Sequence, residues 1–360
     1  GSAMSKHPVA DLRKKLKEAD LLDKPTMKSW LKVISLLIVV CTLYSAHIFL
    51  PLKFGLILIP ITALFSTTLA MTGHEGVHSS ACRSKAGNIS LAAIVFPLFA
   101  GLSMEYWREK HNIQHHAHPN VHTKDPDIHS WPFTFSEEEY VTSGPIRRFF
   151  QRHLQGWTFW PISLLVGHLM RFDGLKYIAS KPFTTKKKKK RFTKIWLLDT
   201  SLILAHFSLW LVLPVVLGIS WQIVVGFYIL LWSLVGTFLT AIFIVGHAGR
   251  PVITEYDQNW RLQIETARRI KLGPVGSFFF VGLDYQIEHH LLPALSHFNL
   301  PKAAPLVKEY AEEQGWEYQE IGFFRALWES TVALHTAWKT PALVLDENGL
   351  LQDPLLTETA

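Results

Sequence analysis

Histidines in this chain gather in three short motifs with helical spacing. The motifs are HEGVH at 74–78, HNIQHH at 111–116 and QIEHH at 286–290. Residues three or four positions apart share one face of a helix, so the first two motifs each direct two imidazoles to one side, and the third places His289 and His290 on the face of Gln286. Imidazole is the commonest nitrogen ligand of transition metals, and one catalytic zinc takes only about three protein ligands. The histidines therefore predict a site for two metal ions.

The first and third motifs each combine paired imidazoles with another polar group. His74 and His78 stand at i and i+4 and flank Glu75, which also matches the HExxH zinc-protease pattern, where the glutamate activates water. In the third motif His289 and His290 follow Gln286 by three and four positions. Gln286 has two interpretations, a metal contact through its carbonyl oxygen or through water, and a hydrogen-bonding spacer.

The second motif repeats the spacing of the first. His111 and His115 share a helical face, and His116 is offset by about 100°, so that it can serve a second metal. Four polar residues that follow are expected around the ligands rather than as ligands, because carboxylates commonly orient ligating imidazoles. They are His118, His122, Asp125 and Asp127. His247 stands alone at the end of an apolar segment, where an ionisable group is costly, and is expected to be a ligand.

Long apolar segments must position these motifs. The chain of 360 residues is 49% hydrophobic, and four runs are each long enough to cross an apolar layer of about 30 Å as a helix. The runs cover residues 30–52, 54–72, 195–219 and 221–245. A weaker run at 89–104 contains a proline and is expected to be re-entrant or interfacial. The predicted fold class is an all-α membrane protein, with two transmembrane hairpins and a helical cap that holds the metals.

Basic residues set the orientation of the hairpins. Lysines and arginines precede the first and third runs and follow the second and fourth, and short basic loops stay in the cytosol. We therefore expect a cytosolic segment at 1–29, a membrane domain at 30–300 and a cytosolic segment at 301–360. Within the membrane domain, the segments at 74–194 and 247–300 are expected to form a cytosolic cap. The tail after about residue 343 is expected to be poorly ordered. All three motifs and His247 then meet on the cytosolic side. The lysine run at 186–190 is expected to contact anionic lipid headgroups, with a docking patch for an acidic electron-transfer partner as the alternative, and no nucleic-acid partner is expected.

These motifs and the two-hairpin layout resemble the integral-membrane fatty acid desaturases with three histidine boxes. The glutamine that opens the third box, with HHAHPN and DPD after the second, resembles the front-end acyl desaturases. The resemblance implies a non-haem centre of two iron ions, with O₂ as co-substrate and a fatty acyl chain drawn from the bilayer. The implied iron ligands are His74, His78, His111, His115, His116, His247, His289 and His290.

One departure from the family pattern concerns the electron supply. Many front-end desaturases carry a fused cytochrome b5 domain with an HPGG motif, whereas this sequence offers only His7-Pro8-Val9-Ala10. The expected donor is therefore a separate ferredoxin, or a cytochrome b5 with its reductase. The same departure favours the bacterial inner membrane over the endoplasmic reticulum.

Three alternative functions stay open at this stage. A membrane hydroxylase uses similar histidine boxes and inserts oxygen instead of removing a second hydrogen. An intramembrane zinc protease would use His74, Glu75 and His78 and would need a third ligand, for which the later apolar runs offer only Asp199. A metal transporter would need ligands in the middle of the membrane, whereas these lie at its edge.

Overall fold

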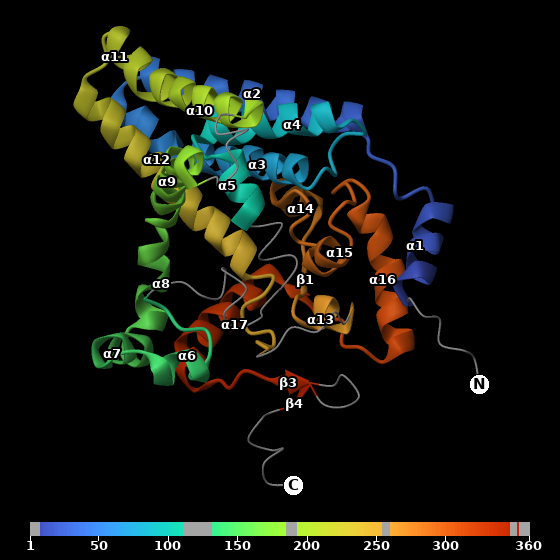
Figure 1. Ribbon diagram of the computed structural model, residues 1–360. Helices are drawn as coiled ribbons and strands as arrows, with labels where there is room; N and C mark the ends of the chain where they lie inside the picture. Colours follow the sequence, from blue (N-terminus) through green and yellow to red (C-terminus); the bar gives the residue numbers. More distant parts are fainter. Residues whose placement is uncertain (1–7, 111–131, 185–192, 254–259, 346–350, 353–360) are drawn as a thin grey trace.

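The structure is a computed structural model that describes residues 8–110, 132–184, 193–253, 260–345 and 351–352. Its regular elements are helices joined by turns and loops, apart from four very short strands, which confirms the predicted fold class. Figure 1 shows the long apolar helices gathered at one end of the molecule and the helices of the C-terminal third at the other. We call the second group, together with the N-terminal helix Pro8–Glu18 and the helices between residues 104 and 184, the cap.

Four helices in the described part of the chain are long and apolar enough to cross a membrane. They are α2 (Thr26–Phe49), α3 (Leu52–Val77), the continuous stretch of α10 (Lys194–Phe207), η4 (Ser208–Val212) and α11 (Leu213–Val216), and α12 (Trp221–Ile244). These are the four predicted runs with shifted ends. The second run was predicted to end at 72, but α3 continues to Val77, because the helical backbone hydrogen bonds extend beyond the last residue of the apolar run. Its last turn therefore carries His74.

Helix α2 shows how these helices pack. Its buried side chains are Ser29, Val33, Leu36 and Val40, which follow one another by three or four positions and so form one stripe along the helix. Leu31 and Ile38 on the other side are 58% and 62% exposed. An apolar helix with one stripe against protein and the remainder exposed fits a lipid-facing position.

The weaker apolar run forms a shorter element. Helix α4 (Lys85–Ala93) begins after Ser84, whose Oγ accepts a hydrogen bond from the Gly87 N–H at 3.0 Å, and continues into the π-helix η1 (Ile94–Ala100). Gly101 ends it with φ +65°, and a Cβ there would lie 2.5 Å from the ring of His206. The element packs between α3 and α10 and is shorter than the four spanning helices.

The cap contains the remaining elements. Its helices are α1 (Pro8–Glu18), α5 (Met104–Arg108), α6 (Glu137–Thr142), α7 (Pro145–His153), α8 (Gln155–Ser163), α9 (Val166–Thr184), α13 (Trp260–Glu265), α14 (Pro274–Phe280), α15 (Gln286–Leu291), α16 (Leu300–Gln314), α17 (Phe323–Thr336) and the 3₁₀ turn η5 (Ala337–Lys339). Strand β1 (Arg269–Lys271) pairs in parallel with β2 (Glu320–Gly322), and β3 (Val344–Leu345) pairs antiparallel with β4 (Leu351–Gln352).

Both ends of the chain contribute to the cap. Leu12 and Leu16 of α1 are buried in one apolar cluster with residues of α15 and α16, and β2 joins the C-terminal segment to the strand that precedes the third motif. The cap is thus built from both terminal segments as well as from residues 104–300. The proposed division at residues 29 and 300 stays a prediction, and the tail after 343, apart from β3 and β4, lies outside the described residues.

Candidate metal centre

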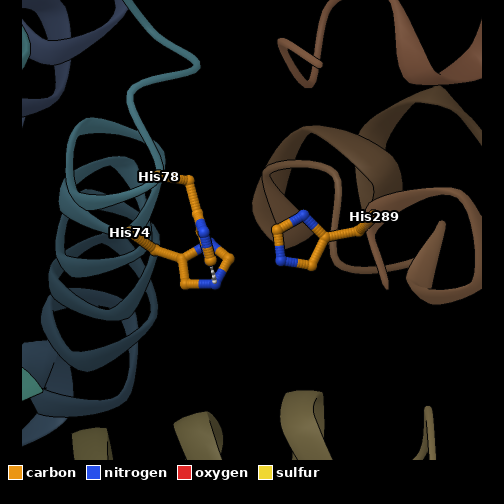
Figure 2. A group of neighbouring side chains, drawn as sticks. All are labelled: His74, His78 and His289. Carbon is orange, nitrogen blue, oxygen red and sulfur yellow. Dashed lines mark hydrogen bonds between the residues drawn. The ribbon is translucent and has the colours of Figure 1, made fainter. Parts of the chain in front are cut away.

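The first and third histidine motifs meet in space. Helix α3 presents His74 on its last turn and His78 at its C-terminal end, and α15 directs His289 toward both from the opposite side, as Figure 2 shows. The Nε2 atoms of His74 and His78 lie 3.0 Å apart, and one nitrogen from each of the three rings lies within 4.8 Å of the others. His74 and His289 are buried.

A second pair of imidazoles lies beside this group. His290, the next residue on α15, brings its Nε2 to 2.7 Å from Nε2 of His247, which follows the end of α12. The Nδ1–H of His247 donates to the carbonyl of Thr266 at 3.1 Å. That bond leaves the lone pair of Nε2 directed toward His290, and it is the usual way in which a protein orients a ligating imidazole.

These distances suit metal coordination. With imidazole–metal bonds of about 2.1 Å, nitrogens 3.0 Å apart subtend about 90° at a shared metal, and nitrogens 2.7 Å apart subtend about 80°. Adjacent residues of α15 serve different groups, because His289 faces His74 and His78 while His290 faces His247. The donor set therefore fits two neighbouring metals that prefer nitrogen ligands.

Five of the eight predicted ligands are thus brought together. They are His74, His78, His247, His289 and His290. The other three, His111, His115 and His116, lie outside the described residues, as do His118, His122, Asp125 and Asp127. That any of these residues binds metal stays a prediction.

Gln286 lies beside the second pair. Its side chain is buried and packs directly against Gly246, the residue before His247, where a Cβ would come within 2.3 Å of Gln286 Cγ. This contact places the glutamine side chain next to the His247 turn. It fits both interpretations of Gln286, as a metal contact and as a spacer.

Glu75 is bound by a residue that the sequence did not single out. One oxygen of its carboxylate accepts a hydrogen bond from the backbone N–H of His297 at 2.5 Å, and the other oxygen lies 2.7 Å from His297 Nδ1 as an ion-pair contact. Lys32 of α2 donates to His297 Nε2 at 3.1 Å, which leaves the ring proton on Nδ1. Nothing in the sequence around His297 has ligand spacing, so only the fold reveals this chain of contacts.

Helix α15 is also fixed through Glu288, which is fully buried and accepts a hydrogen bond from the hydroxyl of Tyr318. Burial raises the pKa of Glu288 to about 7, and the bond from Tyr318 acts in the opposite direction. Because Glu288 binds the segment before β2, it holds the helix that carries His289 and His290 against the C-terminal part of the cap.

A large cavity adjoins the histidines. Its volume is about 910 Å³, and His74 and His247 form part of its wall. Apolar side chains from α3, η1, α9 and α12, such as Met71, Phe96 and Val235, line one part of it. This volume lies within the usual range for small-molecule sites, and the lining suits an apolar chain.

The two acidic residues that the protease hypothesis requires contact groups other than the His74–His78 pair. Asp199 accepts from the Ser103 hydroxyl at 2.6 Å and from the Met104 N–H at 3.0 Å, so it caps the start of α5. The carboxylate of Glu75 is bound to His297. Neither is directed at the His74–His78 pair as a zinc protease would need.

The protein also resembles curated proteins of known name. It is 27% identical to an acyl-lipid (9-3)-desaturase of Physcomitrium patens over 69% of this chain and 46% of that protein. It is 24% identical to a Delta(5) fatty acid desaturase of Caenorhabditis elegans, over 91% and 73% of the two chains, and 26% identical to an sn-1 linoleoyl-lipid 6-desaturase of Synechocystis, over 84% and 86%. The chain thus spans about half the length of some relatives and most of others.

The family model named fatty acid desaturase matches residues 50–322. That range includes all three histidine motifs, His247 and three of the four spanning helices entirely, together with the walls of the cavity on α3 and α12. The chain therefore belongs to the fatty acid desaturase family.

Proposed function

We propose that this protein is a membrane-bound acyl desaturase that uses two iron ions, O₂ and external electrons to place a double bond in a fatty acyl chain. The observation that carries the proposal is the pair of neighbouring histidine groups, linked through the adjacent residues His289 and His290, beside an apolar cavity. His74, His78 and His289 would hold one iron, and His247 and His290 the other. His111, His115 and His116 would complete the two sets.

The chemistry needs a metal centre of this kind. Removing hydrogen from an unactivated methylene requires an oxidant made from O₂, which the two irons supply when bound. The overall reaction converts one –CH₂–CH₂– unit, O₂, two electrons and two protons into –CH=CH– and two waters. The protein itself orients the imidazoles, as the backbone carbonyl of Thr266 does for His247, and its apolar side chains keep the acyl chain in the cavity. Positioning in that cavity selects the C–H bond that reacts.

Electron donor, membrane and regiochemistry are part of the same proposal. The two electrons come from a ferredoxin, or from a cytochrome b5 with its reductase. The centre faces the cytosol, because basic residues follow α3 and α12 where the histidines lie, and the bacterial inner membrane is the favoured location. Front-end regiochemistry is supported by relatives whose names include acyl-lipid (9-3)-, Delta(5)- and Delta(8)-desaturases.

The test is the fatty acid profile of a host that expresses the full chain with a compatible electron donor. Gas chromatography with mass spectrometry should show a new unsaturated acid, absent in His289→Ala. His153→Ala is the matched control, because His153 is an exposed residue of α7. A hydroxylated product would establish the hydroxylase instead. A product that persists in His289→Ala would contradict the ligand assignment.

A further inference from the structure

His247 lies in a turn and not within a helix. Helix α12 ends at Ile244, and the residues from 245 to 249 form hydrogen-bonded turns. Gly249 in this stretch has φ +87°, in the left-handed region that favours glycine. A metal ligand has to be held within about 0.2 Å of its place. Contacts from other parts of the chain must therefore fix the turn.

One short segment, which directly precedes β1, binds three consecutive residues of this turn. The carbonyl of Thr266 accepts from Nδ1 of His247 at 3.1 Å. The backbone N–H of Arg268 donates to the carbonyl of Gly246 at 2.9 Å. Nη1 of Arg268 donates to the carbonyl of Val245 at 3.1 Å. Two of these three hydrogen bonds therefore come from Arg268.

The bond to Val245 serves the end of α12. The last carbonyls of an α-helix have no partner within the helix and need donors from outside it. The same end of a helix carries a partial negative charge, which favours a cation. Arg268 provides both a donor and a positive charge there, since Val245 is the residue that closes the helix.

The guanidinium of Arg268 is itself fixed by two other elements. Its Nε donates to Oε1 of Gln319 at 3.0 Å, and its Nη1 donates to the hydroxyl of Ser330 on α17 at 3.3 Å. The residue is only 1% exposed. Burial, and next the charge of Arg250, lower the pKa of Arg268 to about 10, so it stays protonated at neutral pH. Arg268 thus joins the end of α12 to α17 and to the segment before β2.

We propose that Arg268 is a positioning residue of the second metal site, the site that His247 and His290 would form. Its backbone and its guanidinium hold the residues before His247, so that the imidazole of His247 meets that of His290 at 2.7 Å. Arg268 acts through this turn and does not itself bind the metal. The inference rests on the proposed two-metal centre, and it adds a residue outside the histidine motifs on which the second site depends.

Arg250 supports the same turn from its other end. Its backbone N–H donates to the carbonyl of His247 at 2.9 Å, and its Nε donates to the carbonyl of Glu265 at 3.0 Å. Its Nη1 donates at 3.2 Å to Oε1 of Gln319, the atom that also accepts from Arg268. Keeping two guanidiniums together in a buried place costs free energy. That cost agrees with a turn that must be held in one position.

Cobalt(II) binding to the metal-free, detergent-solubilised full chain tests the proposal without turnover. Imidazole suits divalent ions of this kind, and the visible absorption of cobalt reports the number of bound ions and their ligand geometry. The wild type should bind two ions per chain. Arg268→Gln should bind one ion like the wild type and the other about 10–100-fold more weakly, with a changed absorption for the weakly bound ion.

Arg171→Gln is the matched control. Arg171 is also buried, at 7% exposed, and its Nε and Nη2 donate to the carbonyl of Ala100 at 3.2 and 2.9 Å. Ala100 ends η1, which carries no predicted metal ligand. Both variants should lower Tm, because each leaves a buried carbonyl without its donor. Arg171→Gln should nevertheless bind both cobalt ions like the wild type.

Wild-type cobalt binding in Arg268→Gln, together with a lower Tm, would overturn the proposal and leave Arg268 with a structural role alone. Equal weakening in Arg268→Gln and Arg171→Gln would also overturn it, since lost stability would then explain both. If Arg268→Gln does not fold, Arg268→Lys replaces it. Lysine keeps the charge without the planar fork, so the second ion should bind several-fold more weakly, and unchanged binding would again overturn the proposal. A wild type that binds fewer than two ions would contradict the two-metal centre itself.

Discussion

Replacing Gly246 with alanine should detach the second pair of histidines from its metal. A Cβ at Gly246 would lie 2.3 Å from Cγ and 3.2 Å from Cβ of Gln286. These atoms belong to the root of the glutamine side chain, so rotating its amide does not relieve the clash. Restoring an ordinary contact of 3.4 Å requires the His247 turn and α15 to separate by about 1.1 Å.

That movement is large compared with what a metal site accepts. Metal–ligand distances are held within about 0.2 Å, and His247 and His290 lie on the two segments that must separate. Overpacking of a buried contact costs about 1–3 kcal/mol, so we expect the variant to fold. His74 and His78 are both on α3, which need not move, and their iron should be retained in part.

The assay is iron per chain in purified protein. The iron content of the Gly246→Ala variant should fall from two per chain toward one, and the variant should lose most desaturase activity. Gly226→Ala on the same helix α12 is the control, because a Cβ at Gly226 meets nothing within 4 Å. Two irons and wild-type activity in Gly246→Ala would refute the assignment of the His247–His290 pair as a metal site.

Other substitutions test the surrounding contacts. His297→Leu removes the ring contact with Glu75 and leaves the backbone N–H of residue 297 in place. It should lower iron affinity about 10–100-fold, as measured by chelator titration, and unchanged affinity would separate the His297 ring from the centre. Asp199→Ala leaves Ser103 and the start of α5 without an acceptor and should cost about 1–3 kcal/mol, read as a lower Tm, and an unchanged Tm would contradict the capping role. Gly101→Ala forces a side chain into a left-handed position against a ring and should lower the yield of folded protein, whereas Gly144→Ala, with open space, should not.

Much of the membrane part of the fold follows from the sequence. Apolar length alone located α2, α3, the 194–216 stretch and α12, because a membrane span leaves a strong compositional signal. The predicted ends of these helices were less accurate than their positions, since α3 continues past its apolar run and thereby carries His74. The small cap helices have no comparable signal, because their burial depends on partners far away in the chain.

The candidate site, like the fold, could be predicted from the sequence only in part. Helical spacing within each motif predicted which imidazoles share a face, and topology predicted that His247 joins them. Spacing cannot show that His289 faces α3 while its neighbour His290 faces His247, because that depends on how α15 packs. The contact of Glu75 with His297 spans 222 positions, so no local pattern in the sequence reveals it.

Counting metals in the purified wild-type chain tests the central claim most directly. Elemental analysis by inductively coupled plasma mass spectrometry, normalised to protein by amino-acid analysis, should give two irons per chain and no stoichiometric zinc. The geometry leads to that value because two groups of histidines, with Nε2 pairs at 3.0 and 2.7 Å, lie next to each other and each includes one residue of α15. One zinc per chain without iron, in protein that is folded and loaded from a metal-replete medium, would contradict it.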